Sequence, residues 1–370
     1  QRTNNASKVN KTILQLHEKT RTNQLRIPSA SGVYANKTAR PNGAQHTGTS
    51  RESIEDSNVG DSTDILPSDS RCTAPLKEVR DQTFQGGFTK IHASHGVPKV
   101  IHMTSKSRCM TEPYASNVDR WRWSGYGLRV HDDESVNHIL LRNWSAYFPR
   151  LSRALRCLPR EGESSAAKAD MWRYLLLWQQ GGIYTDIDNA PGDQLASSLE
   201  SFNLTTVDSL IALNWKSKLG QSFMVIAPHH PIMFLCIQRA VQRLLTVENL
   251  ATLNTWKVTG PDVLDSAFAE FIGQPKQKII QDGVYGISST VKEKLQSSFP
   301  KESWMFNRTI HVIGGSSAAE KYVRTSVFHG SEKEMLYNLT GMSKWQGERA
   351  HKSNLSCQSW LAQSNGSTLS

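Results

Sequence analysis

Residues 169–188 read ADMWRYLLLWQQGGIYTDID, and the expected fold is built outward from this stretch. Its first half repeats apolar side chains at a spacing near 3.6 residues, which predicts an α-helix. The pair Gly181-Gly182 is expected to end that helix, because glycine reaches left-handed backbone angles without a steric cost. A short strand, Ile183–Asp188, is then predicted to end in two carboxylates, Asp186 and Asp188.

The predicted helix carries an acid and a base one turn apart. Asp170 and Arg173 stand at positions i and i+3, so their side chains are neighbours along one flank of the apolar stripe. Alone, such a pair is typical of an exposed intrahelical ion pair that contributes about 0.2–0.5 kcal/mol. The strand that follows changes this interpretation.

Two acids end the predicted strand on one face. Because side chains alternate along a strand, Tyr184, Asp186 and Asp188 are predicted to share a side. Carboxylates about 7 Å apart repel unless a cation lies beside them, and Mg²⁺ and Mn²⁺ favour carboxylate, water and phosphate oxygens. A solvated pair of acids is the alternative. A calcium-binding EF-hand loop is excluded, because its fifth and sixth positions would be Ala190 and Pro191. The pattern favours a divalent cation held against a diphosphate.

The rest of the chain alternates strands and helices. Strands are predicted at Val97–Met103, Leu128–His131 and Ser222–Ala227, and helices at Val136–Phe148 and Pro231–Leu245. This alternation predicts an α/β fold with a mostly parallel central sheet flanked by helices. In such sheets, ligands bind beyond the carboxyl ends of the strands.

The stretch 169–188 resembles the core motif of glycosyltransferase family 32. That family includes the yeast-type initiating α-1,6-mannosyltransferases and the animal α-1,4-galactosyl- and α-1,4-N-acetylglucosaminyltransferases. The intervals between Asp170, Arg173 and the two later acids are also similar to those of the glucosylating-toxin transferases. Three further segments agree with the family: Val97–His102, Gly127–Asp133 and Thr259–Pro261. The resemblance covers about residues 90–345.

The resemblance implies a GT-A type fold and a retaining hexosyltransferase that uses a nucleotide-diphosphate sugar, with Mn²⁺ or Mg²⁺ as cofactor. The expected catalytic and metal-binding residues are Asp186 and Asp188, with His329 as a third metal or pyrophosphate ligand. The expected donor-binding residues are Asp170, Arg173, His102 and Tyr184.

Each of the two histidines, His102 and His329, also fits a structural role without any ligand. His102 lies near the end of the first predicted strand and is expected close to the nucleotide, but a hydrogen-bonded core histidine fits that position equally. His329 is followed by Gly330-Ser331, whereas the family tends to close with a histidine and then a Ser-Trp pair. A surface histidine after a strand is the alternative there.

The donor and acceptor stay open. GDP-mannose is favoured, because the Arg-Tyr helix motif resembles the fungal mannosyltransferases. UDP-galactose, UDP-N-acetylglucosamine and UDP-glucose are the other donors, and the acceptor is a glycan or a lipid. Two other classes are weighed against a transferase: a non-catalytic binding protein with the GT-A fold, and a metal-dependent hydrolase of nucleotide sugars.

Composition divides the 370-residue chain into a leader, a core and a tail. Residues 1–82 contain few aromatics and segregated charge, so we expect a disordered stem. The catalytic domain is expected over 83–345 and a flexible tail over 346–370. The formal charge is +10, and within the leader the basic residues of 1–40 are followed by an acidic stretch; no basic-aromatic motif is present, so a nucleic-acid partner is not expected.

The cellular location is predicted as the Golgi lumen. The sequence contains no run of about 20 apolar residues, the length that a membrane-spanning helix needs. Because the chain begins with Gln, we expect that an N-terminal anchor has been removed and that the full-length protein is a type II membrane protein. Several Asn-x-Ser/Thr triplets agree with the secretory pathway. The five cysteines lack zinc-site spacing. One or two disulfides are expected, with Cys236 as a buried small side chain.

Overall fold

The computed structural model describes residues 72–83, 96–158, 166–202, 204, 207–214, 216–300, 303–314, 322–328 and 353–366. All of them belong to one compact unit, Ile65–Ser370. Of the stem expected over residues 1–82, only 72–82 are described. His329 lies outside the described residues.

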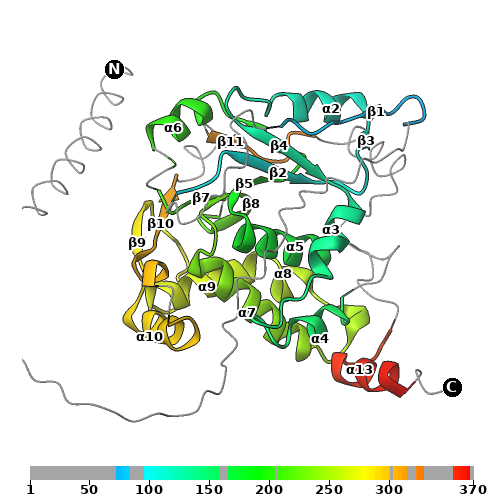
Figure 1. The fold of residues 1–370 in the computed structure, drawn as a ribbon, viewed down its shortest axis with the longest axis vertical. Helices are drawn as coiled ribbons and strands as arrows, with labels where there is room; N and C mark the ends of the chain where they lie inside the picture. Colours follow the sequence, from blue (N-terminus) through cyan, green and yellow to red (C-terminus); the bar gives the residue numbers. More distant parts are fainter. Residues whose placement is uncertain are drawn as a thin grey trace, which may run out of the picture. The chain divides into compact units, whose positions relative to one another are not determined.

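A seven-stranded sheet forms the centre of this unit (Figure 1). In spatial order its strands are β4 (Gly127–His131), β2 (Val100–Thr104), β5 (Gly182–Thr185), β8 (Leu219–Ile226), β7 (Ser209–Leu213), β10 (Thr309–Ile313) and β9 (Gly283–Gly286). Strands β4, β2 and β5 are mutually parallel, as are β7 and β10, while β8 runs antiparallel between β5 and β7. Strand β9 is antiparallel to β10. The expected α/β architecture is confirmed, as a mixed sheet in which five strands share one direction.

A tight turn makes β8 antiparallel. The Asn214 side chain accepts hydrogen bonds from the backbone N–H groups of Lys216 and Lys218, at 2.9 and 3.1 Å. An asparagine that bonds the backbone two residues on mimics and stabilises a turn. The chain therefore folds straight back from β7 into β8, which brings β8 beside β5 and its following loop.

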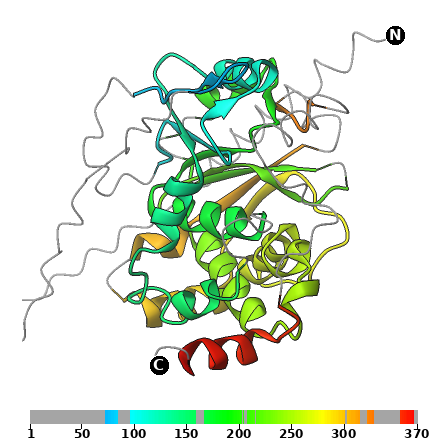
Figure 2. The same cartoon turned by 90° about the vertical axis from the view of Figure 1, so that its right-hand side faces the viewer.

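Helices cover both faces of the sheet (Figures 1 and 2). The helices are α2 (Glu112–Asp119), α3 (Asp133–Leu140), α4 (Leu151–Leu155), α5 (Ala166–Gln179), α6 (Leu195–Ser201), α7 (Pro231–Leu245), α8 (Thr255–Val258), α9 (Pro261–Ile272), α10 (Ser289–Ser298) and α13 (Cys357–Gly366). Two cores result, one under α5, α7 and α9 and the other under α2 and α6. Successive residues of β5 lie in different cores: Ile183 packs in the core under α2 and α6, and Tyr184 in the core under α5, α7 and α9. Side chains that alternate along a strand require this.

The predicted elements agree best where the apolar pattern is long. Helix α7 spans Pro231–Leu245 as predicted. The helix predicted over Val136–Phe148 is wrong, because α3 ends at Leu140. There the Trp144 indole donates to the Ile139 carbonyl at 2.9 Å, which turns the chain back onto the helix end. None of the described helices is long and apolar enough to cross a membrane.

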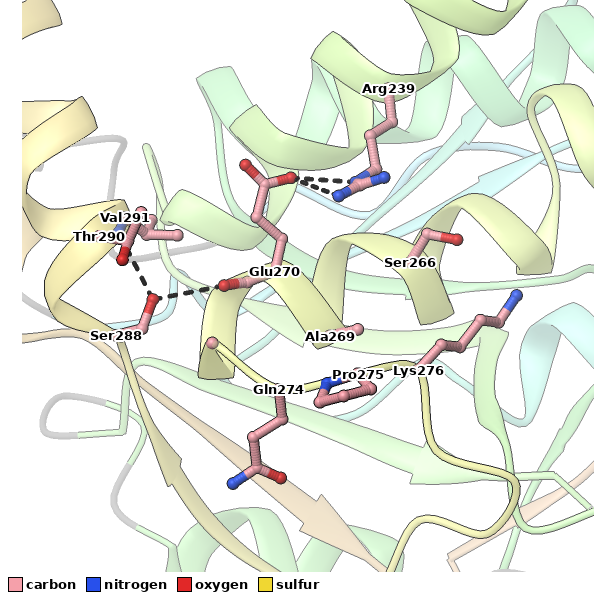
Figure 3. Close-up of a pocket in the computed structure, with 11 residues that line it drawn as sticks. Arg239, Ser266, Ala269, Glu270, Gln274, Pro275, Lys276, Ser288, Thr290 and Val291 are labelled. Atoms are coloured by element: carbon pink, nitrogen blue, oxygen red, sulfur yellow. Dashed lines mark hydrogen bonds and ion pairs between the residues drawn. The ribbon is translucent and has the colours of Figure 1, made fainter.

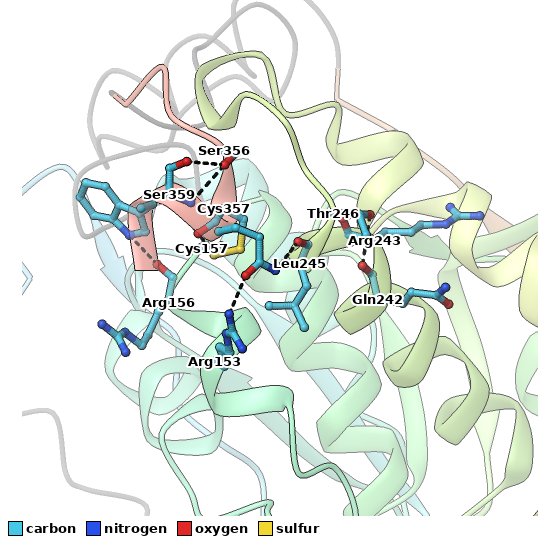
Figure 4. The surroundings of a disulfide bond; sticks show 12 residues. Arg153, Arg156, Cys157, Gln242, Arg243, Leu245, Thr246, Ser356, Cys357 and Ser359 are labelled. Carbon is cyan, nitrogen blue, oxygen red and sulfur yellow. Dashed lines mark hydrogen bonds between the residues drawn. A yellow bond between two sulfur atoms is a disulfide. The ribbon is translucent and has the colours of Figure 1, made fainter. Parts of the chain in front are cut away.

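Two disulfides join distant segments. Cys72 is bonded to Cys109, so residues ahead of the expected boundary at 83 are attached to the folded unit. Cys157 is bonded to Cys357 and holds α13, inside the expected tail, against α4 and α7 (Figure 4). The Gln358 side chain adds a hydrogen bond to the Leu245 carbonyl at 2.9 Å. Cys236 is buried and free, as expected, and burial raises the pKa of its thiol.

The predicted glycine turn is confirmed between α5 and β5. Gly181 and Gly182 have φ angles of 64° and 106°, where L side chains are strained. A Cβ atom on Gly182 would lie 2.7 Å from the Val100 carbonyl oxygen. Neighbouring strand backbone cannot move aside without breaking the sheet.

Gly182→Ala is therefore expected to lower the free energy of unfolding by roughly 2–5 kcal/mol, from backbone strain and overpacking together. Gly286→Ala is the matched control, because a Cβ atom there meets nothing within 4 Å. Urea unfolding of both proteins measures the difference. Equal destabilisation by the two substitutions would contradict this account of the turn.

Candidate active site

Helix α5 holds an acid and a base in the protein interior. Asp170 and Arg173 are 4% and 6% exposed, and an Arg173 Nη atom lies 3.7 Å from Asp170 Oδ1. The pair is therefore buried, unlike the exposed ion pair that the spacing alone suggested. Buried charges persist only where other charges and hydrogen bonds compensate them.

Asp170 is fully engaged by protein groups. Its Oδ1 accepts a hydrogen bond from Gln221 Nε2 at 2.6 Å, and its Oδ2 accepts one from the Thr259 hydroxyl at 2.9 Å. Burial raises the pKa of Asp170, while Arg173 and these two hydrogen bonds act against the rise. Both carboxylate oxygens are thus used inside the protein.

Arg173 connects α5 to two strands. Its Nη1 donates to the Gln221 backbone carbonyl at 2.9 Å, and its Nη2 donates to Asp186 Oδ1 at 3.4 Å. Its guanidinium carbon lies 4.4 Å from the centre of the Tyr184 ring. Burial alone would lower the pKa of Arg173, but the surrounding Tyr184, Asp186 and Asp170 raise it above its ordinary value. The planar fork suits this place because it bonds and stacks at once.

The two acids after β5 lie in a turn rather than on a strand. Strand β5 ends at Thr185, and the Asn189 N–H donates to the Asp186 carbonyl at 3.0 Å. The prediction that Tyr184, Asp186 and Asp188 share one strand face is therefore wrong in its geometry. Two of the three side chains do lie together, because the Tyr184 hydroxyl donates to Asp186 Oδ1 at 2.5 Å.

Neighbouring segments clamp this turn, Asp186–Asn189, through its backbone. From α2, the Asn117 amide donates to the Ile187 and Asn189 carbonyls at 3.0 and 2.7 Å. The Val327 N–H donates to the Asp188 carbonyl at 2.8 Å. The Asn189 side chain donates to the Ser222 carbonyl of β8 at 2.8 Å. The turn is therefore fixed before any ligand binds, which is what a preorganised site requires.

The turn presents its carboxylates toward solvent. The Asp186 side chain is 32% exposed and Asp188 is partly exposed, in contrast to Asp170. Burial raises the pKa of Asp186 to about 6; Arg173 opposes this, Asp188 adds to it, and Tyr184 opposes it. Two close carboxylates with one raised pKa form an environment in which a cation is stabilising.

A divalent cation fits the chemistry of this pair. Carboxylate oxygens suit Mg²⁺ and Mn²⁺, which usually take one or two protein carboxylates and complete their coordination with water and phosphate oxygens. Among the residues that the structure describes, no group of three or more His, Cys, Asp and Glu side chains gathers into a metal cage. The third ligand expected at His329 falls outside those residues.

His102 is placed away from the acids. It lies in the middle of β2, is 1% exposed, and its Nδ1 is 3.1 Å from Nε2 of His131, which is 9% exposed. Burial, with His131 and Arg129, lowers the pKa of His102 well below its ordinary value, so the ring is neutral. A core position describes His102 better than a contact with a nucleotide.

Three partners of the cluster were missed from sequence. Gln221 and Thr259 hold Asp170, and Asn189 holds the turn. Thr259 falls inside the Thr-Gly-Pro segment noted for its family resemblance, yet no role was assigned to it. Gln221 had a weak local signal, as a polar residue just ahead of the apolar second half of β8, but its partner lies 51 positions away.

A surface hollow of about 500 Å³ lies elsewhere, between α7, α9 and α10 (Figure 3). Its charged lining is already paired: Arg239 donates twice to Glu270, at 2.6 and 3.0 Å. The hollow shares no residue with the cluster around Asp186.

The sequence around the cluster matches a described family. Residues 149–206 match the model described as "Glycosyltransferase sugar-binding region containing DXD motif". The resemblance to family 32 glycosyltransferases is confirmed. The matched segment contains α5, β5 and the clamped turn, so the DXD residues are Asp186 and Asp188.

Two curated relatives share one description. An "Initiation-specific alpha-1,6-mannosyltransferase" of Schizosaccharomyces pombe is 23% identical over 202 residues, covering 48% of this chain and 49% of the relative. A protein of the same description from Candida albicans is 37% identical over 65 residues, covering 17% and 16%. The chain therefore spans about half the length of the first relative and less of the second.

Among solved structures, "PaToxG Glycosyltransferase" aligns with a TM-score of 0.34 and 17% identity, covering 67% of this chain and 86% of that one. A similarity at that level defines neither fold nor function.

Proposed function

We propose that this chain is a metal-dependent, retaining glycosyltransferase of the GT-A type. It transfers a hexose, with mannose favoured, from a nucleotide-diphosphate sugar to a glycan or lipid acceptor. One observation supports this above the others: Arg173 donates to Asp186 inside a turn whose backbone is clamped, beside a partly exposed Asp188. The DXD-family match and the mannosyltransferase relatives supply the reaction class and the favoured donor.

The two acids of the turn have different proposed roles. Asp188 binds the cation, Mn²⁺ or Mg²⁺, directly. Asp186 holds the donor ribose or sugar, or reaches the cation through a water molecule. When bound, the cation neutralises charge on the departing diphosphate. The fixed turn keeps both carboxylates in position, so little reorganisation opposes donor binding.

Asp170 and Arg173 of α5 are proposed to act from behind the turn, through Asp186 and Tyr184. Asp170 is 4% exposed and both of its oxygens accept protein hydrogen bonds, so it is poorly placed to bond a sugar hydroxyl directly. We therefore propose that Asp170 and Arg173 support donor binding indirectly, by holding Asp186 and Tyr184 in position. Asp170 holds the guanidinium, and the guanidinium holds Asp186 and stacks on Tyr184.

The secretory pathway is the proposed location. Two disulfides among the described cysteines agree with an oxidising compartment such as the Golgi lumen. The mannosyltransferase relatives support the same pathway.

The proposed reaction has a pH dependence with a defined sign. The pKa of Asp186, raised to about 6, means that this carboxyl gains a proton as the pH falls through that value. Donor binding and kcat/KM are expected to fall with it, because the neutral acid loses its attraction for the cation. The raised pKa makes folding slightly more favourable as the pH falls from about 6 toward the unfolded value near 4.

Loss of activity near pH 5.5 should therefore come without loss of thermal stability. Parallel measurement of kcat/KM and Tm between about pH 5 and pH 8 separates the two. A flat activity profile over that range would contradict the assigned role of Asp186.

A donor screen tests the function itself. GDP-mannose, UDP-galactose, UDP-N-acetylglucosamine and UDP-glucose are each incubated with Mn²⁺, with and without chelator, and with oligomannoside or lipid acceptors. Chelator-sensitive transfer from one donor supports the proposal. Donor hydrolysis with which no acceptor competes would favour a hydrolase. Metal-dependent binding without turnover of any donor would favour a non-catalytic binding protein.

A further inference from the structure

Gln221 makes three contacts to one face of helix α5. It lies near the start of β8, is partly buried, and uses each of its polar groups except its N–H toward the helix. Its backbone carbonyl accepts from Arg173 Nη1 at 2.9 Å, and its Nε2 donates to Asp170 Oδ1 at 2.6 Å. Its Oε1 accepts from the Tyr174 hydroxyl at 3.0 Å.

Chemistry fixes the orientation of this amide. An ionised carboxylate only accepts hydrogen bonds, so Asp170 must face the NH₂ group of Gln221. The Tyr174 hydroxyl is then left to donate to the amide oxygen. Glutamate has the same size as glutamine but would set a second carboxylate against Asp170, which repels at short range. The position therefore discriminates between two side chains of nearly equal shape.

We propose that Gln221 is a positioning residue for donor binding. It fixes Asp170 through its side chain and Arg173 through its backbone, so that the guanidinium reaches Asp186 in the clamped turn. Because β8 lies beside β5 in the sheet, the same strand supports the turn through the Ser222 carbonyl. One strand thus holds both the α5 pair and the acids. This inference rests on the proposed glycosyltransferase function.

Two other roles for Gln221 give different results. As a packing residue alone, it would be replaced without effect by methionine, which has similar length and no amide. If the Gln221 amide instead occupied the position at which a sugar hydroxyl of the donor binds Asp170, it would compete with the donor. Its removal would then lower the donor KM. As a positioning residue, its removal raises the donor KM.

Gln221→Met and Gln221→Glu are assayed with GDP-mannose and Mn²⁺, beside the wild-type protein. Hydrogen bonds to charged groups are worth enough that the methionine variant should raise the donor KM about 10- to 100-fold. Its acceptor KM should stay within about twofold, and the glutamate variant should be worse still. Gln82→Met is the matched control, because the Gln82 side chain likewise makes two hydrogen bonds, here both donated, to the Trp123 and Tyr126 carbonyls at 3.1 and 3.0 Å. It should leave the donor KM unchanged even where Tm falls.

A wild-type donor KM in Gln221→Met, or a lowered one, would overturn the assignment. Where that variant does not fold, Tyr174→Phe carries the same test, since it removes the hydroxyl that donates to the Gln221 amide oxygen at 3.0 Å and, at 3.4 Å, to the Gly260 carbonyl. About a threefold or greater rise in donor KM is expected, and no rise overturns the assignment. A wild-type protein that turns over no nucleotide sugar would instead refute the proposed function, and this inference with it. The two failures are therefore distinguishable.

Discussion

Asp188→Ala is expected to reduce donor turnover about 1000-fold at saturating Mn²⁺, the magnitude typical of losing a main electrostatic contact to the transition state. The reason is that Asp188 is the proposed direct ligand of the cation that neutralises the departing diphosphate. The fold should survive, because the clamp on this residue uses its backbone carbonyl, bonded to the Val327 N–H, and the substitution keeps that carbonyl. Steady-state transfer with Mn²⁺, beside thermal unfolding, measures both effects.

Asp193→Ala is the matched control for that loss. Asp193 lies five positions after Asp188 and its side chain is 94% exposed, with Arg324 as an exposed partner 3.5 Å away. Surface ion pairs of this kind contribute little, so the control should keep wild-type activity and stability. Activity that falls equally in both variants would show that loss of any acid near the turn suffices. Activity unchanged by Asp188→Ala would remove Asp188 from the metal site, whatever the family resemblance.

Arg173→Lys is expected to reduce kcat/KM at least about 100-fold and the free energy of unfolding by roughly 2–4 kcal/mol. Lysine keeps the charge but loses the planar fork, so it cannot bond the Gln221 carbonyl and Asp186 while stacking on Tyr184. Its ammonium would be buried with fewer hydrogen bonds, which weakens the compensation of the buried Asp170 carboxylate and of Asp186. Urea unfolding and donor kinetics give the two magnitudes.

Arg239→Lys provides the comparison for that substitution. Arg239 also donates two guanidinium hydrogen bonds, both to Glu270, but at a partly exposed position on α7. The control should cost less than about 1 kcal/mol and leave donor kinetics unchanged. Full activity in Arg173→Lys would mean that a positive charge alone suffices at this place. The fork would then have no role in holding Asp186.

The sequence predicted those parts of the site that are local in the chain. The period of apolar residues in 166–179, the glycine turn and the paired acids lie within 25 positions, and each depends on neighbours along the backbone. The long apolar run of α7 was likewise predicted to its ends. These elements follow from helical period, capping and glycine conformation, which short windows contain.

The missed parts depend on contacts between distant segments. The strand ends at Thr185 because Asn117 and Val327, which lie far before and far after the turn in the sequence, bond its backbone. No local pattern contains that information. The buried state of Asp170 was missed for the same reason, since Gln221 and Thr259 reach it from 51 and 89 positions away. His102 was expected near the nucleotide because its strand was predicted to end near His102–Thr104. The strand does end at Thr104, but His102 is buried within it, 3.1 Å from His131, which comes from a different strand.

Cysteine pairing was open at the level of sequence and needed the fold. Cys157 and Cys357 are 200 positions apart, and only the packing of α13 against α4 and α7 brings them together. The free thiol at Cys236 was predictable, because a cysteine inside a long apolar helix face is buried on its own element.

The turn Asp186–Asn189 is proposed to hold a divalent cation together with a nucleotide diphosphate. Electron paramagnetic resonance of Mn²⁺ tests it without requiring turnover or an acceptor, because bound Mn²⁺ loses the sharp signal of the free aqueous ion. With GDP present, adding the wild-type protein should remove free Mn²⁺ beyond the amount that GDP alone binds, up to one ion per protein, whereas the Asp188→Ala protein should leave free Mn²⁺ at the level that GDP alone sets. Equal Mn²⁺ binding by the two proteins in the presence of GDP would contradict the claim.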